Sequence, residues 1–110
     1  MNTLRQTAAG IGLGLVLVST PAFAACFEDV GCTDNHFMSV SQLRKLSCDA
    51  LWTVRNTIYD ENGYCFHTAR AKSVFSNAGC SYNNGAAIPF DKYERTNIQR
   101  VLSVEHSKGC

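Results

Sequence analysis

The chain lacks a charge excess, a membrane-length apolar run and the short motifs that signal a known reaction. The chain has ten Lys/Arg and nine Asp/Glu, so its net charge does not favour binding to nucleic acid or to an anionic membrane. The longest apolar run, residues 8–18, is shorter than the roughly 20 residues of a membrane-spanning helix. Gly-x-Ser-x-Gly and His-Glu-x-x-His are both absent, which leaves no serine-hydrolase or zinc-hydrolase pattern. We therefore expect no nucleic-acid partner, no transmembrane anchor and no cofactor.

The first 24 residues contain the three parts of a bacterial export signal. Arg5 supplies positive charge, residues 8–18 are apolar, and Ala22-Phe23-Ala24 offers small residues at both recognition positions of a signal peptidase. We expect cleavage after Ala24 and a periplasmic or secreted product. The alternative is lipidation at Cys26, because the residues before it loosely resemble a lipobox, with Phe23 where Leu is usual.

All six cysteines follow this signal, so they are expected to meet an oxidising compartment. Removing 24 of the 110 residues leaves 86, a single domain whose small core gives a thin margin of stability. An even cysteine count predicts three disulfides, each contributing about 2–4 kcal/mol. His67 and His106 near Cys65 and Cys110 raise the alternative of a metal site, but there is no Cys-x-x-Cys pair, and we expect no metal. The disulfide candidates are Cys26, Cys32, Cys48, Cys65, Cys80 and Cys110.

Apolar spacing and capping residues predict an all-α domain of three to four short helices. A capping box beginning at Ser39 opens a helix over residues 40–46. Ser47 caps a second helix over 48–62, and Gly63 can take the left-handed position that closes it.

Two further helices are expected downstream. Thr68 caps the third, whose apolar face includes Val74 and which Gly79 ends. Asp91 opens the last, which carries Leu102 among its apolar residues.

These helices suggest how the cysteines pair. If the three longer helices alternate in direction, Cys48 and Cys80 lie at one end of the bundle and Cys65 and Cys110 at the other. Helix 48–62 is about 22 Å long, whereas bridged Cα atoms lie within about 7 Å, so a bridge between its two ends is disfavoured. Among the roughly 15 possible sets, we favour Cys48–Cys80, Cys65–Cys110 and Cys26–Cys32.

The middle of the chain contains residues in a recognisable order. They are Leu43-Arg44-Lys45-Leu46-Ser47-Cys48, Leu51-Trp52, Arg55-Asn56, Ile58-Tyr59, Gly63-Tyr64 and Phe66, followed by Phe75, Glu94 and Asn97-Ile98. Over residues 39–104 this order resembles the YARHG domain, a short extracytoplasmic module of bacteria. The resemblance implies a helical fold and an envelope or secreted location, and it implies no reaction.

The motif that names the YARHG family is altered here. Tyr59 and Gly63 match it, but Asp60, Glu61 and Asn62 occupy the positions where the family prefers Ala, Arg and His or Asn. A binding role of the family's Arg or His therefore does not carry over to this chain. The expected organisation is a signal peptide (1–24), an N-terminal arm (25–38) and a YARHG-like helical domain (39–110).

Trp52, Arg55 and Tyr59 are the candidate binding residues. Their spacing places them on one helical face, where two rings and a cation suit a sugar ring or a peptide. The interpretation that we favour is that both rings pack in the core and Arg55 lies across one of them or bonds a carbonyl, because so small a domain has few large residues to spare. Asp60 and Glu61 do not form a glycosidase pair, because adjacent helical residues point about 100° apart.

Three classes of function remain open, and no catalytic residue is assigned. The favoured one is a non-enzymatic binding module of the bacterial cell envelope, whose partner is an unidentified protein or a glycan such as peptidoglycan. The second is an inhibitor of a secreted or host hydrolase. The third is a small envelope hydrolase whose site forms only in the fold. A shallow aromatic patch would favour binding, a protruding loop an inhibitor, and a deep cleft with paired titrating groups an enzyme.

Overall fold

The computed structural model describes residues 25–110, so the expected signal peptide lies outside the described residues. These residues form four α-helices, one 3₁₀ turn and a two-stranded antiparallel hairpin. The fold is mainly helical, and the hairpin corrects the prediction of an all-α domain. In chain order the elements are β2 (Cys26–Phe27), β3 (Gly31–Cys32), α1 (Val40–Leu43), α2 (Cys48–Glu61), α3 (Ala69–Val74), η2 (Gly85–Ala87) and α4 (Lys92–Lys108).

The helices begin at the predicted capping residues. The side chains of Ser47, Thr68 and Asp91 each accept a hydrogen bond from the backbone N–H three residues further on. Asp91 and Glu94 form a complete capping box, in which each side chain accepts from the other residue's backbone N–H. Gly63 follows α2 with φ +83°, a backbone conformation that favours glycine. Local chemistry therefore sets these helix ends.

Two helices are shorter than predicted. α1 ends at Leu43 rather than at residue 46, and α3 ends at Val74 rather than at Gly79. The backbone at Phe75 is extended, with φ −114° and ψ 132°, and its ring stacks on Phe66 with centroids 4.9 Å apart. Val74 is 57% exposed, so the helical spacing of apolar residues in this segment does not mark a buried face.

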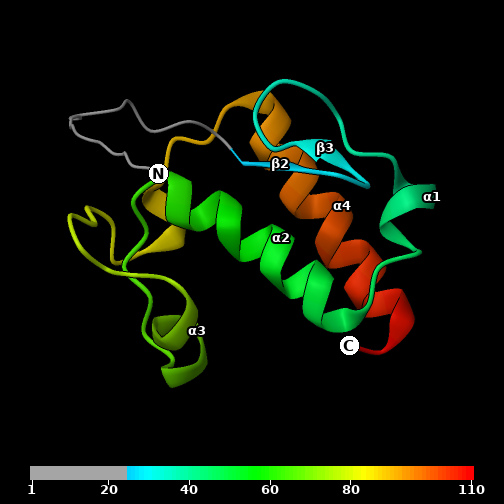
Figure 1. Cartoon of the computed structure of the whole chain (residues 1–110). Coiled ribbons are helices and arrows are strands. Elements are labelled where there is room, and N and C mark those ends of the chain that lie inside the picture. Colours follow the sequence, from blue (N-terminus) through cyan, green and yellow to red (C-terminus); the bar gives the residue numbers. More distant parts are fainter. Residues whose placement is uncertain (1–24) are drawn as a thin grey trace, which may run out of the picture.

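The core lies between α2, α4 and the N-terminal arm. α2 and α4 lie side by side and run in opposite directions (Figure 1). Leu51, Val54 and Ile58 on α2 are buried, as their spacing predicts. On α4, Val101 is buried but Leu102 is 47% exposed, because the next helical position points about 100° away. The buried cluster consists of Val30, Met38, Leu43, Leu51, Val54, Val101 and Val104.

The arm is joined to α4 by Asn97, which is fully buried. Its Nδ2 donates to the backbone carbonyls of Thr33 and His36 at 3.1 and 3.0 Å, and its Oδ1 accepts from the Met38 N–H at 2.8 Å. One side chain therefore satisfies three backbone groups of the arm, which would otherwise be buried without partners.

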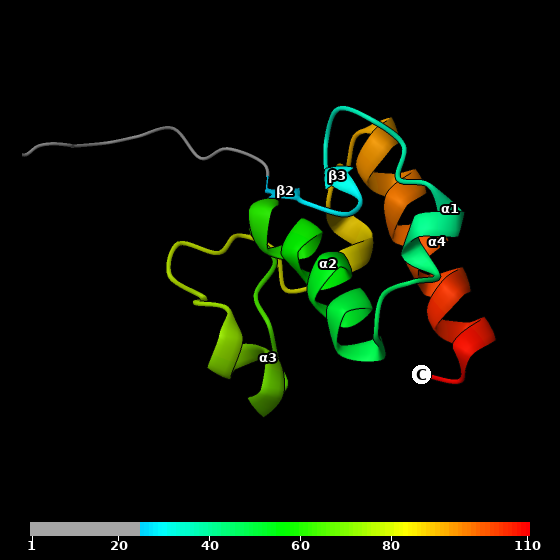
Figure 2. The same ribbon diagram turned by 45° about the vertical axis from the view of Figure 1, so that its right-hand side comes forward.

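All six cysteines form disulfides, but two predicted pairs are wrong. The observed bridges are Cys26–Cys32, Cys48–Cys110 and Cys65–Cys80. Cys48–Cys80 and Cys65–Cys110 were expected because three long helices were assumed to alternate in direction. However, α3 has only six residues and lies to the side of α2 away from α4 (Figure 2). The chain therefore reaches Cys80 near Cys65, and only α4 returns to Cys48.

Candidate functional site

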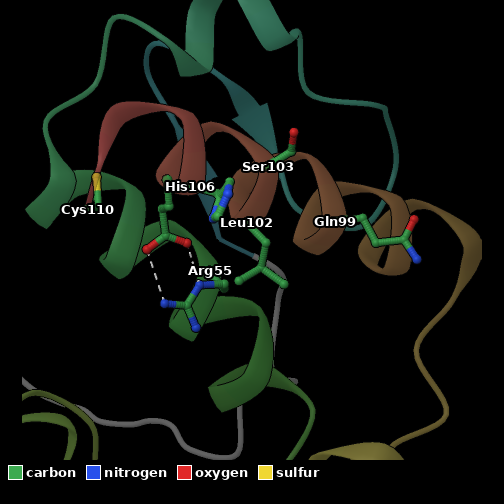
Figure 3. A pocket seen from close by; sticks show the side chains of 7 residues that line it. Arg55, Gln99, Leu102, Ser103, His106 and Cys110 are labelled. Carbon is green, nitrogen blue, oxygen red and sulfur yellow. Dashed lines mark hydrogen bonds and ion pairs between the residues drawn. The ribbon is translucent and has the colours of Figure 1, made fainter.

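Arg55 projects from α2 towards α4 and forms an ion pair with Glu105. Its Nε and Nη2 donate to the two carboxylate oxygens at 2.6 and 3.1 Å (Figure 3). The side chains are 22% and 13% exposed, and a two-point bond of this kind fixes the plane of the guanidinium. Nη1 makes no hydrogen bond within residues 25–110. Within the described residues, one donor group of a rigidly held cation is therefore left without a hydrogen-bond partner.

Two shallow hollows share Arg55. The larger, about 630 Å³ in volume, opens between α2 and α4 (Figure 3). Its other lining residues are Gln99, Leu102, Ser103, Glu105, His106 and Cys110. The smaller, about 250 Å³, is lined by Arg55, Asn56, Tyr59, Tyr64 and Gly85. We call the linings of the two hollows, taken together, the Arg55 surface.

Tyr59 forms an aromatic wall of the smaller hollow. Its ring meets those of Tyr64 and Phe90 edge-on, with centroids 5.3 and 5.2 Å apart. Gly85 lies against the same ring, and a Cβ at that position would be 3.0 Å from Tyr59 Cε1. Tyr59 is therefore packed on several sides while it also lines a hollow.

Trp52 lies apart from Arg55 and Tyr59 in its contacts. The Arg70 guanidinium carbon lies 3.9 Å from the centre of the Trp52 ring, and the Phe75 ring lies 5.9 Å away. Trp52 lines neither of the two hollows. The predicted stripe is thus divided: Arg55 and Tyr59 share one hollow, and Trp52 joins α2 to the segment that contains α3.

Asp60 and Glu61 lie at the end of α2, and both carboxyls have a raised pKa. Burial raises the pKa of Asp60. Burial is also the largest cause of the raised pKa of Glu61, which hydrogen bonds from the Ala25 N–H and the Thr33 hydroxyl only partly oppose. The two Glu61 oxygens accept these two hydrogen bonds. Glu61 is therefore occupied by the arm rather than directed with Asp60 into a shared cleft.

Sequence reasoning did not identify Glu105 as the partner of Arg55. Arg55 is seven residues after Cys48, and Glu105 is five residues before Cys110. Because these cysteines are bridged and the helices are antiparallel, the two side chains lie at similar heights above the disulfide. The distances of Arg55 and Glu105 from Cys48 and Cys110 could have predicted the pair, but only once the Cys48–Cys110 bridge was known.

The described residues contain no group of three or more His, Cys, Asp or Glu side chains placed to hold a metal ion. His36 and His67 bond backbone carbonyls of Val30 and Asn83 at 2.9 and 3.0 Å, while His106 lines the larger hollow. Within residues 25–110, every helix is too short or too polar to cross a membrane.

Comparison with known proteins gives one family match. A family model, described as the YARHG domain, matches residues 28–106. This range covers most of the chain and includes most of the segment expected to be an arm. No curated protein and no solved structure matches the chain.

Proposed function

Since this chain belongs to the YARHG domain family, we propose that it is a non-enzymatic binding module of the bacterial cell envelope. Family membership and three disulfides fit a small extracytoplasmic domain. In this proposal residues 1–24 direct export, the mature protein begins at Ala25 and acts in the periplasm or after secretion, and its ligand is a glycan strand of peptidoglycan.

The observation that carries the proposal is a fixed guanidinium beside an aromatic wall on an open surface. The apolar faces of sugar rings pack against aromatic rings, and sugar hydroxyls accept hydrogen bonds from planar donors. Tyr59 and Tyr64 supply the rings, and Arg55 Nη1 supplies the donor. Gln99 extends the polar lining into the larger hollow. Both hollows are shallow, which favours binding along a strand over enclosure of a reacting bond.

The test is retention of the mature protein on purified insoluble peptidoglycan. The test variant is Arg55→Gln combined with Glu105→Gln, which removes both charges together and leaves neither one unpaired in a partly buried site. We expect about tenfold weaker retention, because a hydrogen bond from a charged donor contributes roughly 1.5–3 kcal/mol.

The matched control is Arg70→Gln combined with Asp49→Asn. It removes the exposed Arg70–Asp49 pair, so one cation and one anion are lost and net charge stays the same, as in the test variant, and we expect unchanged retention. Equal losses in both variants would show that retention does not depend on the Arg55 surface. No retention of the unaltered protein would contradict a peptidoglycan ligand.

A second candidate function is inhibition of a hydrolase. It is favoured by the Cys65–Cys80 bridge, which closes a loop that contains α3 beside the helix pair (Figure 2). Val74 in that loop is 57% exposed. If the loop enters an active site, Val74→Asp should abolish inhibition of a susceptible protease or glycosidase and leave retention on peptidoglycan unchanged.

A further inference from the structure

Glu61 is bound by the very first residue of the described chain. Its Oε2 accepts a hydrogen bond from the backbone nitrogen of Ala25, and its Oε1 accepts one from Thr33 Oγ1 at 2.8 Å. The Thr33 N–H in turn donates to the Ala25 carbonyl at 3.1 Å. The Cys26–Cys32 bridge closes the same hairpin. The Ala25 nitrogen is therefore held by its hydrogen bond to Glu61 and by the hairpin to which Ala25 is bonded.

The surroundings of Glu61 are acidic. The carboxylates of Glu94, at the start of α4, and Asp34, in the arm, raise its pKa further, after the larger effect of burial. Asp60 precedes it on α2, and both residues lie in the last turn of that helix, where the macrodipole disfavours negative charge. The ion pairs within residues 25–110 are Arg55–Glu105 and Arg70–Asp49, so neither brings a cation to Glu61.

Cleavage after Ala24 would create a cation at this place. In the uncleaved chain the Ala25 nitrogen is a neutral peptide N–H, whereas in the cleaved chain it is an α-ammonium group with an ordinary pKa of about 7.7–8.0. The small residues of the signal-peptidase site end one position before this nitrogen. The sequence and the contact with Glu61 thus point independently to the same atom.

We propose that Glu61 is the docking site for the α-ammonium group that signal-peptide removal creates at Ala25. Processing then replaces a neutral hydrogen bond with an ion pair and fastens the arm to the end of α2. The proposal rests on the cleavage site and does not depend on what the Arg55 surface binds. It is incompatible with lipidation at Cys26, because the lipid would be attached to the sulfur that forms the bridge to Cys32.

The test compares mature protein that begins with a free Ala25 amine with the same chain acetylated at that amine. Acetylation restores an amide N–H and removes only the charge, as in the precursor. Each form is made with Glu61 and with Glu61→Gln, and its three disulfides are verified by mass. We expect acetylation to raise the unfolding equilibrium constant roughly tenfold with Glu61, the scale of one partly buried ion pair, and to have little effect in Glu61→Gln.

A ¹³C NMR titration of the Glu61 carboxyl supplies a readout that packing alone would not change. Its pKa should be lower with the free amine than with the acetylated one, despite the neighbouring Asp60, Asp34 and Glu94. We expect the carboxylate to raise the folded-state pKa of the amine. The stabilising effect of the ion pair is therefore complete only between the pKa of Glu61 and about pH 7.7. It disappears as pH rises through the raised pKa of the amine and as pH falls through the pKa of Glu61.

Asp60→Asn is the control, because Asp60 lies next to Glu61 but makes no bond to Ala25; the acetylation effect should persist in it. Equal effects of acetylation with Glu61 and with Glu61→Gln would overturn the proposal, as would an unchanged Glu61 pKa. A mature N-terminus other than Ala25 would also overturn it, whatever the result on peptidoglycan.

Discussion

Two parts of this molecule are held together by different forces. The helix-pair body, residues 25–61 and 92–110, has aliphatic side chains at its centre, with Leu51 and Val101 fully buried. The excursion, residues 62–91, buries little besides Phe66, Ala71 and Ile88. Its aromatic rings contact one another in pairs. The rings of Tyr64 and Phe66, for example, meet edge-on with their centroids 5.0 Å apart. The body therefore depends on apolar burial, whereas the excursion depends on a few aromatic contacts and one bridge.

Asparagine is used in the same way in both parts, at different depths. In the body, Asn97 is fully buried and bonds the backbone of the arm. In the excursion, Asn77 is only partly buried and bonds the backbone N–H and C=O of Phe66 at 2.9 and 3.0 Å. A buried chain segment without regular structure needs side-chain partners for its backbone. The difference in burial between the two sites predicts a difference in stability, which mutations can measure.

The largest expected effect is loss of the Cys48–Cys110 bridge. Replacing both cysteines with Ser frees a bridge of sequence separation 62 and should lower the free energy of unfolding by about 4 kcal/mol on the loop-entropy model. The same change at Cys65–Cys80, separation 15, should cost about 3 kcal/mol. Urea denaturation followed by circular dichroism gives both values.

The location of the effect is more informative than its size. Without Cys65–Cys80, hydrogen exchange should speed up in residues 62–91, while amides of α2 and α4 stay protected. If α2 and α4 lost protection equally, the body and the excursion would unfold as one cooperative unit.

The two asparagines give the next effect. Asn97→Ala leaves the Met38 N–H buried without a partner and should cost about 2–3 kcal/mol. Asn77→Ala should cost about 1 kcal/mol, because Asn77 is only partly buried and water can take the place of its side chain beside Phe66. The measurement is the urea midpoint of each variant. Equal losses would show that the excursion is as well sealed from water as the body.

Sequence reasoning was accurate where local chemistry decides the structure. Ser47, Thr68 and Asp91 begin helices because their side chains bond the first free N–H groups. The buried face of α2 was likewise predicted from the spacing of Leu51 and Ile58. The family resemblance was also confirmed, over a longer range than residues 39–104.

Sequence reasoning failed where distant contacts decide. α3 ends at Val74 because the ring of Phe75 stacks on Phe66, and the spacing of apolar residues does not predict that contact. Overestimating α3 then misplaced two bridges and hid the Arg55–Glu105 pair. The hairpin of the arm was missed for a similar reason: strands of two residues each have no pattern to detect.

Gly85→Ala tests the contact between the two parts. The added Cβ would lie 3.0 Å from the Tyr59 ring, which cannot easily move because Tyr64 and Phe90 contact it from other sides. We expect a loss of about 1 kcal/mol. In a Tyr59→Leu background the substitution should cost much less, and a double-mutant cycle of urea midpoints measures the coupling. Additive effects would place the strain somewhere other than Tyr59.

The smallest effect concerns Asp60, where the body meets the excursion. Burial raises its pKa in the folded state, so between its unfolded and folded pKa values the native protein binds more protons than the unfolded chain. Stability therefore falls as pH rises through this window. Asp60→Asn should stabilise the protein at pH 7 by at most about 0.5 kcal/mol, because a carboxylate that is only partly buried is still screened by water. The gain should disappear below the ordinary pKa of aspartate. Urea midpoints at pH 7 and at about pH 3 test this, and a gain that was equal at both pH values would mean that packing, not the buried charge, sets the stability of this junction.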